Sequence, residues 1–220
     1  MSNFAQARIN MVDSQLRPNG ITDIRILDAM HAVMRENFVG NDQQNLAYMD
    51  GDVPLKQATG GPRSLISPMV FGRMLQAAAI RPADRVLDIG AATGYGAMVL
   101  SQIASQIVAV EEDPALAAIL RKNLASVANV SVLEGALDIG APETQKFDLI
   151  IIEGCVQEVP SALFSQVKDG GRIVAAVGQP EMAKCCVYKI SGQTHTFRAA
   201  FDISVAALGS SAKPKPKFAF

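Results

Sequence analysis

The sequence is poor in residues that bind metals or form covalent cross-links. It has two histidines and three cysteines, at Cys155, Cys185 and Cys186. Adjacent cysteines rarely bridge to each other, the number is odd, and no CxxC spacing occurs. The pattern therefore indicates reduced thiols and argues against a zinc site, so we expect no metal.

The sequence also lacks an excess of charge and a long apolar run. Its formal net charge is −1 at pH 7, which gives no reason to expect binding to nucleic acid or to an anionic membrane. No stretch is long and apolar enough to span a bilayer, and residues 1–8 lack the apolar run of a signal peptide. We expect a cytoplasmic protein, and the sequence gives no oligomeric state.

Apolar residues, in contrast, are abundant. They make up 49% of the 220 residues, which is enough for a sizeable core. We expect one domain with appendages: amino-terminal helices and a long loop over 1–80, a core over 81–209, and a tail over 210–220. The tail is rich in serine, lysine and proline, which predicts mobility.

Predicted strands alternate with predicted helices along the core. The strands cover 86–89, 107–110, 130–133, 147–152 and 172–177, and the helices cover 97–103, 115–124 and 160–167. Two more strands, 187–190 and 196–203, predict an antiparallel pair near the carboxyl end. This order is typical of an α/β fold, a Rossmann-like doubly wound sheet of about seven strands. Ligands of such sheets bind at the carboxyl ends of the strands.

Before the core, the sequence pattern predicts helices up to about residue 41, and Thr22 is a candidate N-terminal cap of the second of them. Residues 41–63 form a long irregular segment, which in a compact domain is usually functional or mobile. A helix over 69–79 follows, and either Ser64 or Ser67 is expected to cap it.

The stretch RVLDIGAATGY, from Arg85 to Tyr95, carries the strongest functional signal. An apolar strand with one acid, Asp88, runs into a loop of small residues and then into a helix. Small residues let backbone N–H groups approach a ligand closely, and the helix N-terminus adds a partial positive charge. Ala92 stands between Gly90 and Gly94, so the dinucleotide fingerprint G-x-G-x-x-G is not present. The spacing and the acid favour an S-adenosylmethionine loop, with an ordinary β–α turn as the alternative.

A second acid follows at the interval that a nucleoside cradle requires. Glu111 ends the strand 107–110, about twenty residues past the loop. A carboxylate there accepts two hydrogen bonds from the vicinal diol of a ribose. The residues expected around the cofactor are thus Asp88, Gly90, Ala92, Gly94, Tyr95 and Glu111.

Short motifs follow one another along nearly the whole chain. They are Gln15-Leu16-Arg17, Gly20-Ile21, Arg35-Glu36, Phe38-Val39, Ala47-Tyr48, Pro54-Leu55, Val86-Leu87-Asp88-Ile89-Gly90, Gly94-Tyr95, Phe147-Asp148, Val159-Pro160, Gly170-Gly171 and Val177-Gly178. In this order they resemble the protein-L-isoaspartate O-methyltransferase family. The resemblance implies a class I methyltransferase fold that uses S-adenosylmethionine. It also implies a cytoplasmic repair enzyme whose partners are damaged polypeptides carrying isoaspartyl residues.

The sequence departs from that family's pattern at four places. Ile66 stands where the family has the serine of Ile-Ser-x-Pro, so the resemblance implies Ser67 as the catalytic hydroxyl, one place later. Ala136 and Leu137 stand where the family's Gly-Asp-Gly faces the adenine, which implies that they line the cofactor. Ala92 replaces a loop glycine, and 206–208 read Ala-Ala-Leu in place of Val-Pro-Leu over the substrate.

Methyl transfer from a sulfonium to a carboxylate needs no general base. The carboxylate, with a pKa of about 4, is already ionised at pH 7. Alignment of the reacting atoms then lowers the barrier, by roughly 7 to 11 kcal/mol in favourable cases. Two other hypotheses remain open: a methyltransferase of the same fold with a different carboxylate or small-molecule substrate, and a non-catalytic relative that binds the cofactor.

Overall fold

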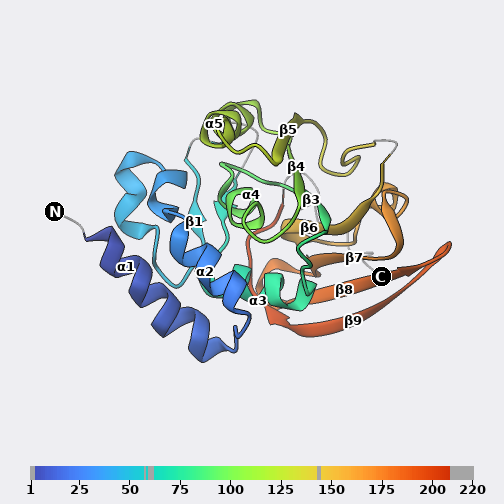
Figure 1. Cartoon of the computed structure of the whole chain (residues 1–220), viewed down its shortest axis with the longest axis horizontal. Coiled ribbons are helices and arrows are strands. Elements are labelled where there is room, and N and C mark those ends of the chain that lie inside the picture. The colour runs from blue at the N-terminus through green and yellow to red at the C-terminus, as the bar shows by residue number, and fades with distance from the viewer. Residues whose placement is uncertain (1–2, 57, 59–61, 143–144, 209–220) are drawn as a thin grey trace, which may run out of the picture.

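The computed structural model describes residues 3–56, 58, 62–142 and 145–208, and it contains one seven-stranded sheet (Figure 1). The spatial order is β5-β4-β3-β6-β7-β8-β9. Five strands are parallel: β3 (Arg85–Ile89), β4 (Gln106–Glu111), β5 (Val130–Glu134), β6 (Phe147–Val156) and β7 (Val167–Val177). The last two, β8 (Ala183–Ser191) and β9 (Thr194–Ile203), are antiparallel. The doubly wound α/β prediction, with its terminal antiparallel pair, is confirmed. The predicted tail at 210–220 lies outside the described residues.

The sheet has one point at which the strand order reverses. The chain enters at β3, adds β4 and β5 on one side, and returns to place β6 on the other side of β3. Ile89, the last residue of β3, pairs with Val110 of β4 and with Ile152 of β6. The residues that follow these three partners therefore meet at one edge, which is the usual ligand position in such sheets.

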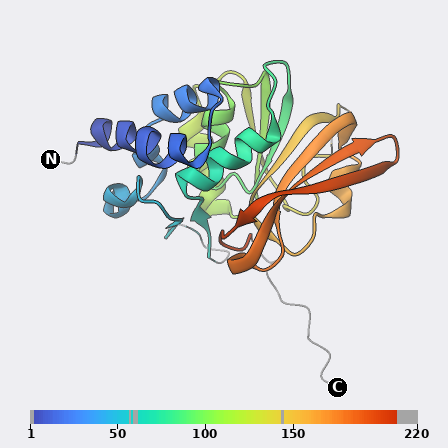
Figure 2. The ribbon, with the colours of Figure 1, turned by 90° about the horizontal axis from the view of Figure 1, so that it is seen from below.

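Helices cover the sheet and extend beyond it. They are α1 (Phe4–Asn10), α2 (Ile24–Ala32), α3 (Pro68–Ala78), α4 (Tyr95–Leu100), α5 (Pro114–Leu124) and α6 (Ser161–Phe164). Short helical turns occur at η1 (Met11–Leu16), η2 (Arg17–Asn19), η3 (Arg35–Phe38), η4 (Asn41–Leu46) and η5 (Pro180–Met182), and β1 (Val53–Pro54) pairs with β2 (Ser64–Leu65). The amino-terminal helices lie at one end of the molecule and the β8–β9 hairpin at the other (Figures 1 and 2). No helix in the described part of the chain is long and apolar enough to cross a membrane.

Several predicted helix ends differ from the observed ones. Asp23, and not Thr22, caps α2, because its carboxylate accepts a bond from the Arg25 N–H while Gln76 holds the Thr22 backbone. Ser67 caps α3, with its Oγ 3.4 Å from the Val70 nitrogen, and Ser64 lies in β2. The helices predicted over 97–103 and 160–167 are shorter, and the irregular stretch 41–63 contains η4 and β1.

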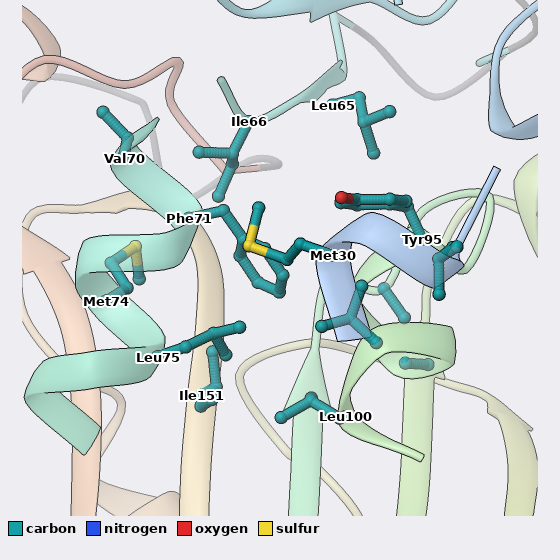
Figure 3. Packing of buried hydrophobic residues seen from close by; sticks show 14 of the residues in the cluster. Met30, Leu65, Ile66, Val70, Phe71, Met74, Leu75, Tyr95, Leu100 and Ile151 are labelled. Atoms are coloured by element: carbon teal, nitrogen blue, oxygen red, sulfur yellow. The ribbon is translucent and has the colours of Figure 1, made fainter. Parts of the chain in front are cut away.

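Two apolar clusters cover the two faces of the sheet. Along β3, Val86 belongs to the cluster under the helices, whereas Leu87 and Ile89 belong to the opposite one. This is the period of two expected for a strand, so Asp88 points to the helical face. Figure 3 shows that face, where side chains from α2, α3 and α4 meet; the rings of Phe71 and Tyr95 are 5.9 Å apart there.

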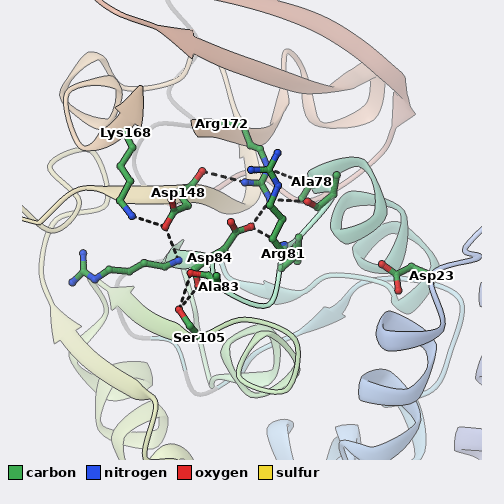
Figure 4. Close-up of polar contacts among 12 residues, drawn as sticks. Asp23, Ala78, Arg81, Ala83, Asp84, Ser105, Asp148, Lys168 and Arg172 are labelled. Carbon is green, nitrogen blue, oxygen red and sulfur yellow. Dashed lines mark hydrogen bonds and ion pairs between the residues drawn. The ribbon is translucent and has the colours of Figure 1, made fainter. Parts of the chain in front are cut away.

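A half-buried arginine, Arg172, ties the sheet to the end of α3 (Figure 4). Arg172 of β7 donates to the carbonyls of Ala78 and Ala79 and to that of Asp148. Its guanidinium also pairs with the Asp84 carboxylate at 2.6 Å, with side-chain exposures of 14% and 5%. One side chain therefore satisfies the last carbonyls of a helix and an acid at the start of β3.

We expect Arg172→Met to destabilise the fold by about 3–5 kcal/mol, because it leaves a buried carboxylate and three carbonyls without their partner. Urea unfolding measures the change. Lys184→Met is the control, since it removes an ion pair with Asp202 whose side chains are 59% and 85% exposed. It should change stability by less than about 0.5 kcal/mol. Equal losses in the two variants would contradict the assignment.

Candidate cofactor and substrate site

The loop after β3 combines three left-handed backbone conformations. Gly90, Ala92 and Gly94 have φ values of 80°, 51° and 98°. Glycine adopts such angles freely, but at Ala92 the conformation costs about 1–2 kcal/mol. The loop is fixed because Gly90 and Ala91 donate to the Val110 carbonyl, and because the Ala92 N–H donates to Glu111 at 2.8 Å. It leads directly into α4.

Glu111, at the end of β4, is fully buried and accepts four hydrogen bonds. Its Oε1 accepts from Arg63 Nη1 at 2.6 Å and from the Asp113 N–H at 2.9 Å. Its Oε2 accepts from Arg63 Nη2 at 2.8 Å and from the Ala92 N–H. The structure thus brings the predicted loop and the predicted acid together, and it adds an arginine. Asp113 in turn caps α5 through its own carboxylate.

Two side chains from distant segments lie over the loop. Arg63 Nη2 also donates to the Gly90 carbonyl at 3.0 Å. A Cβ placed on Gly90 would lie 2.6 Å from Leu208 Cδ1, so Leu208 packs directly on the glycine. The segment that carries Leu208 is held on β6 by hydrogen bonds between its backbone and that of Cys155. Glycine is therefore required at position 90 by its conformation and by this close approach.

A pair of buried acids lies beneath the loop. Asp88 of β3 is fully buried, burial raises its pKa to about 7, and its carboxyl group lies within hydrogen-bond reach of that of Glu153. Burial and the neighbouring Asp88 raise the pKa of Glu153 of β6 well above its usual value. The pair therefore holds a proton near neutral pH. A Cβ on Gly96 would lie 1.5 Å from Glu153 Oε1. The carboxylate of Glu153 therefore fits only because residue 96 has no side chain.

Aromatic and cationic groups complete the buried cluster around these acids. Tyr95 is 1% exposed, its ring packs against Phe38 at 5.7 Å, and the Arg35 guanidinium lies 4.6 Å from its centre. Burial lowers the pKa of Arg35 and raises that of Tyr95. Arg35 is anchored by donating to the carbonyls of Ala47 and Ile66.

Ser67 lies on a surface hollow beside this cluster. The hollow has a volume of about 450 Å³ and is bordered by residues of the segment before α3, of α3 itself and of the end of β9, among them Asp52, Ser67 and Arg73. Asp52 fixes the region by accepting from the backbone N–H groups of Ser67 and Ala206 at 2.8 and 2.9 Å. Asp52 also borders a much smaller inner space of about 10 Å³, which Ile66, Glu153 and residues 205–208 line with it.

The remaining predicted positions lie in the turn after β5. Ala136 is exposed, and its carbonyl accepts from the backbone N–H groups of Ile139 and Gly140. Leu137 is 5% exposed and packs in the cluster on the second face of the sheet. Both follow β5 at the same sheet edge as Glu111, which pairs with Glu134.

Sequence reasoning singled out the loop, Glu111 and Ser67, but it missed Arg63, Arg35 and Asp52 as site residues. Arg63 lies 48 positions before Glu111, in a segment without periodicity, so no local pattern pairs the two. Arg35 was named only as part of a motif shared with the family, and no role was predicted for it. The described residues contain no cluster of histidine, cysteine and acidic side chains that could hold a metal ion.

The residues around the loop fit S-adenosylmethionine. Glu111 can receive a ribose diol, and the small residues of the loop admit a close backbone approach. Asp88 and Glu153 share a proton beneath the loop, so the pair can keep one negative charge, which suits a cationic ligand. Arg63 and Leu208 lie where such a ligand would face Glu111 and Gly90.

Comparison with known proteins gives one consistent result. A family model described as protein-L-isoaspartate(D-aspartate) O-methyltransferase matches residues 7–202. A protein-L-isoaspartate O-methyltransferase of Koribacter versatilis is 39% identical over 83% of this chain and 81% of its own length. One of Methylorubrum extorquens is 40% identical over 80% of this chain and 76% of its own length.

Solved structures agree on the fold. A protein-L-isoaspartate O-methyltransferase superposes with a TM-score of 0.82 at 22% identity, covering 93% of this chain and 67% of that one. A Plasmodium falciparum protein assigned to the same family, in complex with S-adenosyl-L-homocysteine, gives a TM-score of 0.74 at 15% identity. That alignment covers 94% of this chain and 99% of the other.

We expect Glu153→Gln to gain stability relative to the wild type as the pH rises from about 5 to about 8. Because folding raises the pKa values of Asp88 and Glu153, the folded protein binds more protons than the unfolded chain, and the stability of the wild type falls as those protons leave. The variant lacks one of these groups. Urea unfolding at several pH values measures a difference that grows by up to about 1.4 kcal/mol per pH unit. A difference independent of pH would contradict the coupling, and Glu181→Gln, at an exposed position, should show none.

Proposed function

Because this chain belongs to the protein-L-isoaspartate(D-aspartate) O-methyltransferase family, we propose that it methylates isoaspartyl carboxylates in damaged polypeptides with S-adenosylmethionine. The family match includes the loop after β3, the end of β4 and the start of α3, which are the segments that form the site. The observation that carries the proposal is the position of Asp52. Asp52 borders the outer hollow and also a space of about 10 Å³ that Glu153 and Leu208 line, so it lies between the proposed substrate side and the proposed cofactor side.

The cofactor would lie across the carboxyl ends of β3, β4 and β5. Glu111 would accept the ribose hydroxyls, and Gly90, Ala92 and Gly94 would face the methionine end. Asp88 and Tyr95 would support this loop from below, since both are buried within or beneath it. Ala136 and Leu137, in the turn after β5, would border the adenine.

When bound, S-adenosylmethionine supplies an electrophilic methyl group. A bond forms between that carbon and a carboxylate oxygen as the bond to sulfur breaks, so the products are a methyl ester and S-adenosylhomocysteine. The acceptor is already ionised near pH 7, so the protein has no proton to remove. The chain's own task is to align the acceptor and to exclude water.

Ser67 would orient the acceptor carboxylate. Its Oγ accepts only the long 3.4 Å capping bond among the hydrogen bonds of the described residues, which leaves the hydroxyl proton to donate. Ile66, the residue at the family's serine position, is 3% exposed and packs in the core (Figure 3). The hollow of about 450 Å³ that Ser67 borders is open to the surface, as binding of a polypeptide segment requires.

We expect the protein to transfer labelled methyl groups to an isoaspartyl peptide and not to the matched aspartyl peptide. Ser67→Ala should lower kcat/KM roughly 5- to 150-fold, because one hydrogen bond to a charged acceptor is worth about 1–3 kcal/mol. Ser67→Gly is the matched variant, since glycine at a helix cap costs only a few tenths of a kcal/mol while alanine costs about 1. Equal losses in both variants identify the hydroxyl as the cause, and a loss confined to Ser67→Ala would indicate capping alone. No transfer to either peptide would favour a different substrate.

We expect Glu111→Gln to weaken S-adenosylhomocysteine binding at least tenfold in calorimetry, because charge-assisted bonds to the ribose diol are lost. Glu112→Gln, one residue further and partly exposed, should bind as the wild type does. Unchanged affinity of Glu111→Gln would remove Glu111 from the cofactor site.

A further inference from the structure

Three hydrogen bonds to other described residues hold the guanidinium of Arg63 on the cradle. Two of them form a bidentate pair with Glu111, at 2.6 and 2.8 Å, between side chains that are 5% and 0% exposed. The third goes to the Gly90 carbonyl at 3.0 Å. Bidentate arginine–carboxylate pairs are among the strongest polar contacts in proteins, and this one is shielded from solvent.

This pair competes with the proposed ligand for the same atoms. A carboxylate offers about four lone-pair positions, and all four on Glu111 accept a bond. Two of the donors are backbone N–H groups, of Ala92 and Asp113, and belong to the cradle itself. The other two are the Arg63 N–H groups. A ribose diol can therefore bond to Glu111 only where Arg63 now bonds.

We propose that Arg63 is a built-in competitor of the cofactor ribose, which keeps the Glu111 carboxylate paired and must leave it when the cofactor binds. This inference rests on the proposed function. It assigns Arg63 as a residue that sets cofactor affinity: the stronger its pair with Glu111, the weaker the binding.

The backbone of Arg63 is part of the segment that leads to the proposed substrate side. The Arg63 carbonyl accepts from the Leu55 N–H at 2.7 Å, and β2 follows at once and pairs with β1. Ser67 is four residues beyond Arg63 in the sequence. Arg63 thus lies on the same short segment as the proposed acceptor-positioning hydroxyl, and the backbone of that segment is held in place by these bonds while the side chain moves.

Calorimetry with S-adenosylhomocysteine on Arg63→Ala tests the proposal. We expect at least a tenfold gain in affinity, together with a lower unfolding temperature without ligand, because Glu111 is left buried without its cation. Arg63→Lys keeps the charge but not the bidentate geometry, so its affinity for S-adenosylhomocysteine should lie between those of the wild type and Arg63→Ala. Arg25→Ala is the control: it removes a partly exposed ion pair with Asp23, distant from Arg63 in the sequence, and should lose stability without gaining affinity.

Weaker or equal binding by Arg63→Ala, with clear binding by the wild type, would overturn the proposal and leave the proposed function standing. Absence of binding by both proteins would overturn the proposed function and this inference together.

A second measurement needs no variant. In the wild type, the guanidinium of Arg63 is shielded, since the residue is 6% exposed. Phenylglyoxal, which reacts with accessible arginines, should label Arg63 slowly without ligand and at least several-fold faster at saturating S-adenosylhomocysteine, as read by peptide mass spectrometry. Unchanged labelling of Arg63 at saturation would overturn the proposal.

Discussion

The buried carboxylate of Glu111 is the group on which the geometry of the site depends. It joins the end of β4 to the loop after β3 through Ala92, to the start of α5 through Asp113, and to the segment before β2 through Arg63. An uncompensated charge in this position would cost several kcal/mol, so the donors around Glu111 stabilise the fold as well as forming the site. The left-handed conformation of Ala92 is tolerated for the same reason, because the N–H that it points at Glu111 is needed there.

A second set of buried acidic groups lies beneath the loop after β3 and has fewer hydrogen-bond donors than Glu111. Asp88 and Glu153 face each other on adjacent strands, with Arg35 near enough to lower the pKa of Glu153 against the effect of burial. The two acids are kept in the fold at an energetic cost that hydrophobic residues of similar size would avoid. Costly polar groups beneath a ligand cradle are common at functional sites, and a cationic ligand would compensate the negative charge that this pair keeps.

The sequence predicted the sheet, and the meeting of the loop after β3 with Glu111, because those features are local. A buried parallel strand, a loop of small residues and an acid at a strand end each have a pattern within a few residues, and the strand order then brings Gly90 and Glu111 to one edge. Helix ends were less accurate. Thr22 and Asp23 are adjacent candidates of similar capping strength, and the choice was decided by Gln76, which is distant in sequence and holds the Thr22 backbone.

The substrate side could not be predicted to the same degree, because its contacts join segments without periodicity. Asp52 holds Ser67 and Ala206, which are 15 and 154 residues away, through backbone groups that any residue type would provide. Arg63, like Asp52, makes a long-range contact that no sequence pattern indicates. An arginine in an irregular stretch gives no sign that it will pair with an acid at the end of a strand. A buried acid at a ligand edge nevertheless requires a partner, and the stretch 41–63 contains two cations, Lys56 and Arg63. Because arginine alone can pair with a carboxylate through two parallel hydrogen bonds, the need of Glu111 for a partner favours Arg63 over Lys56.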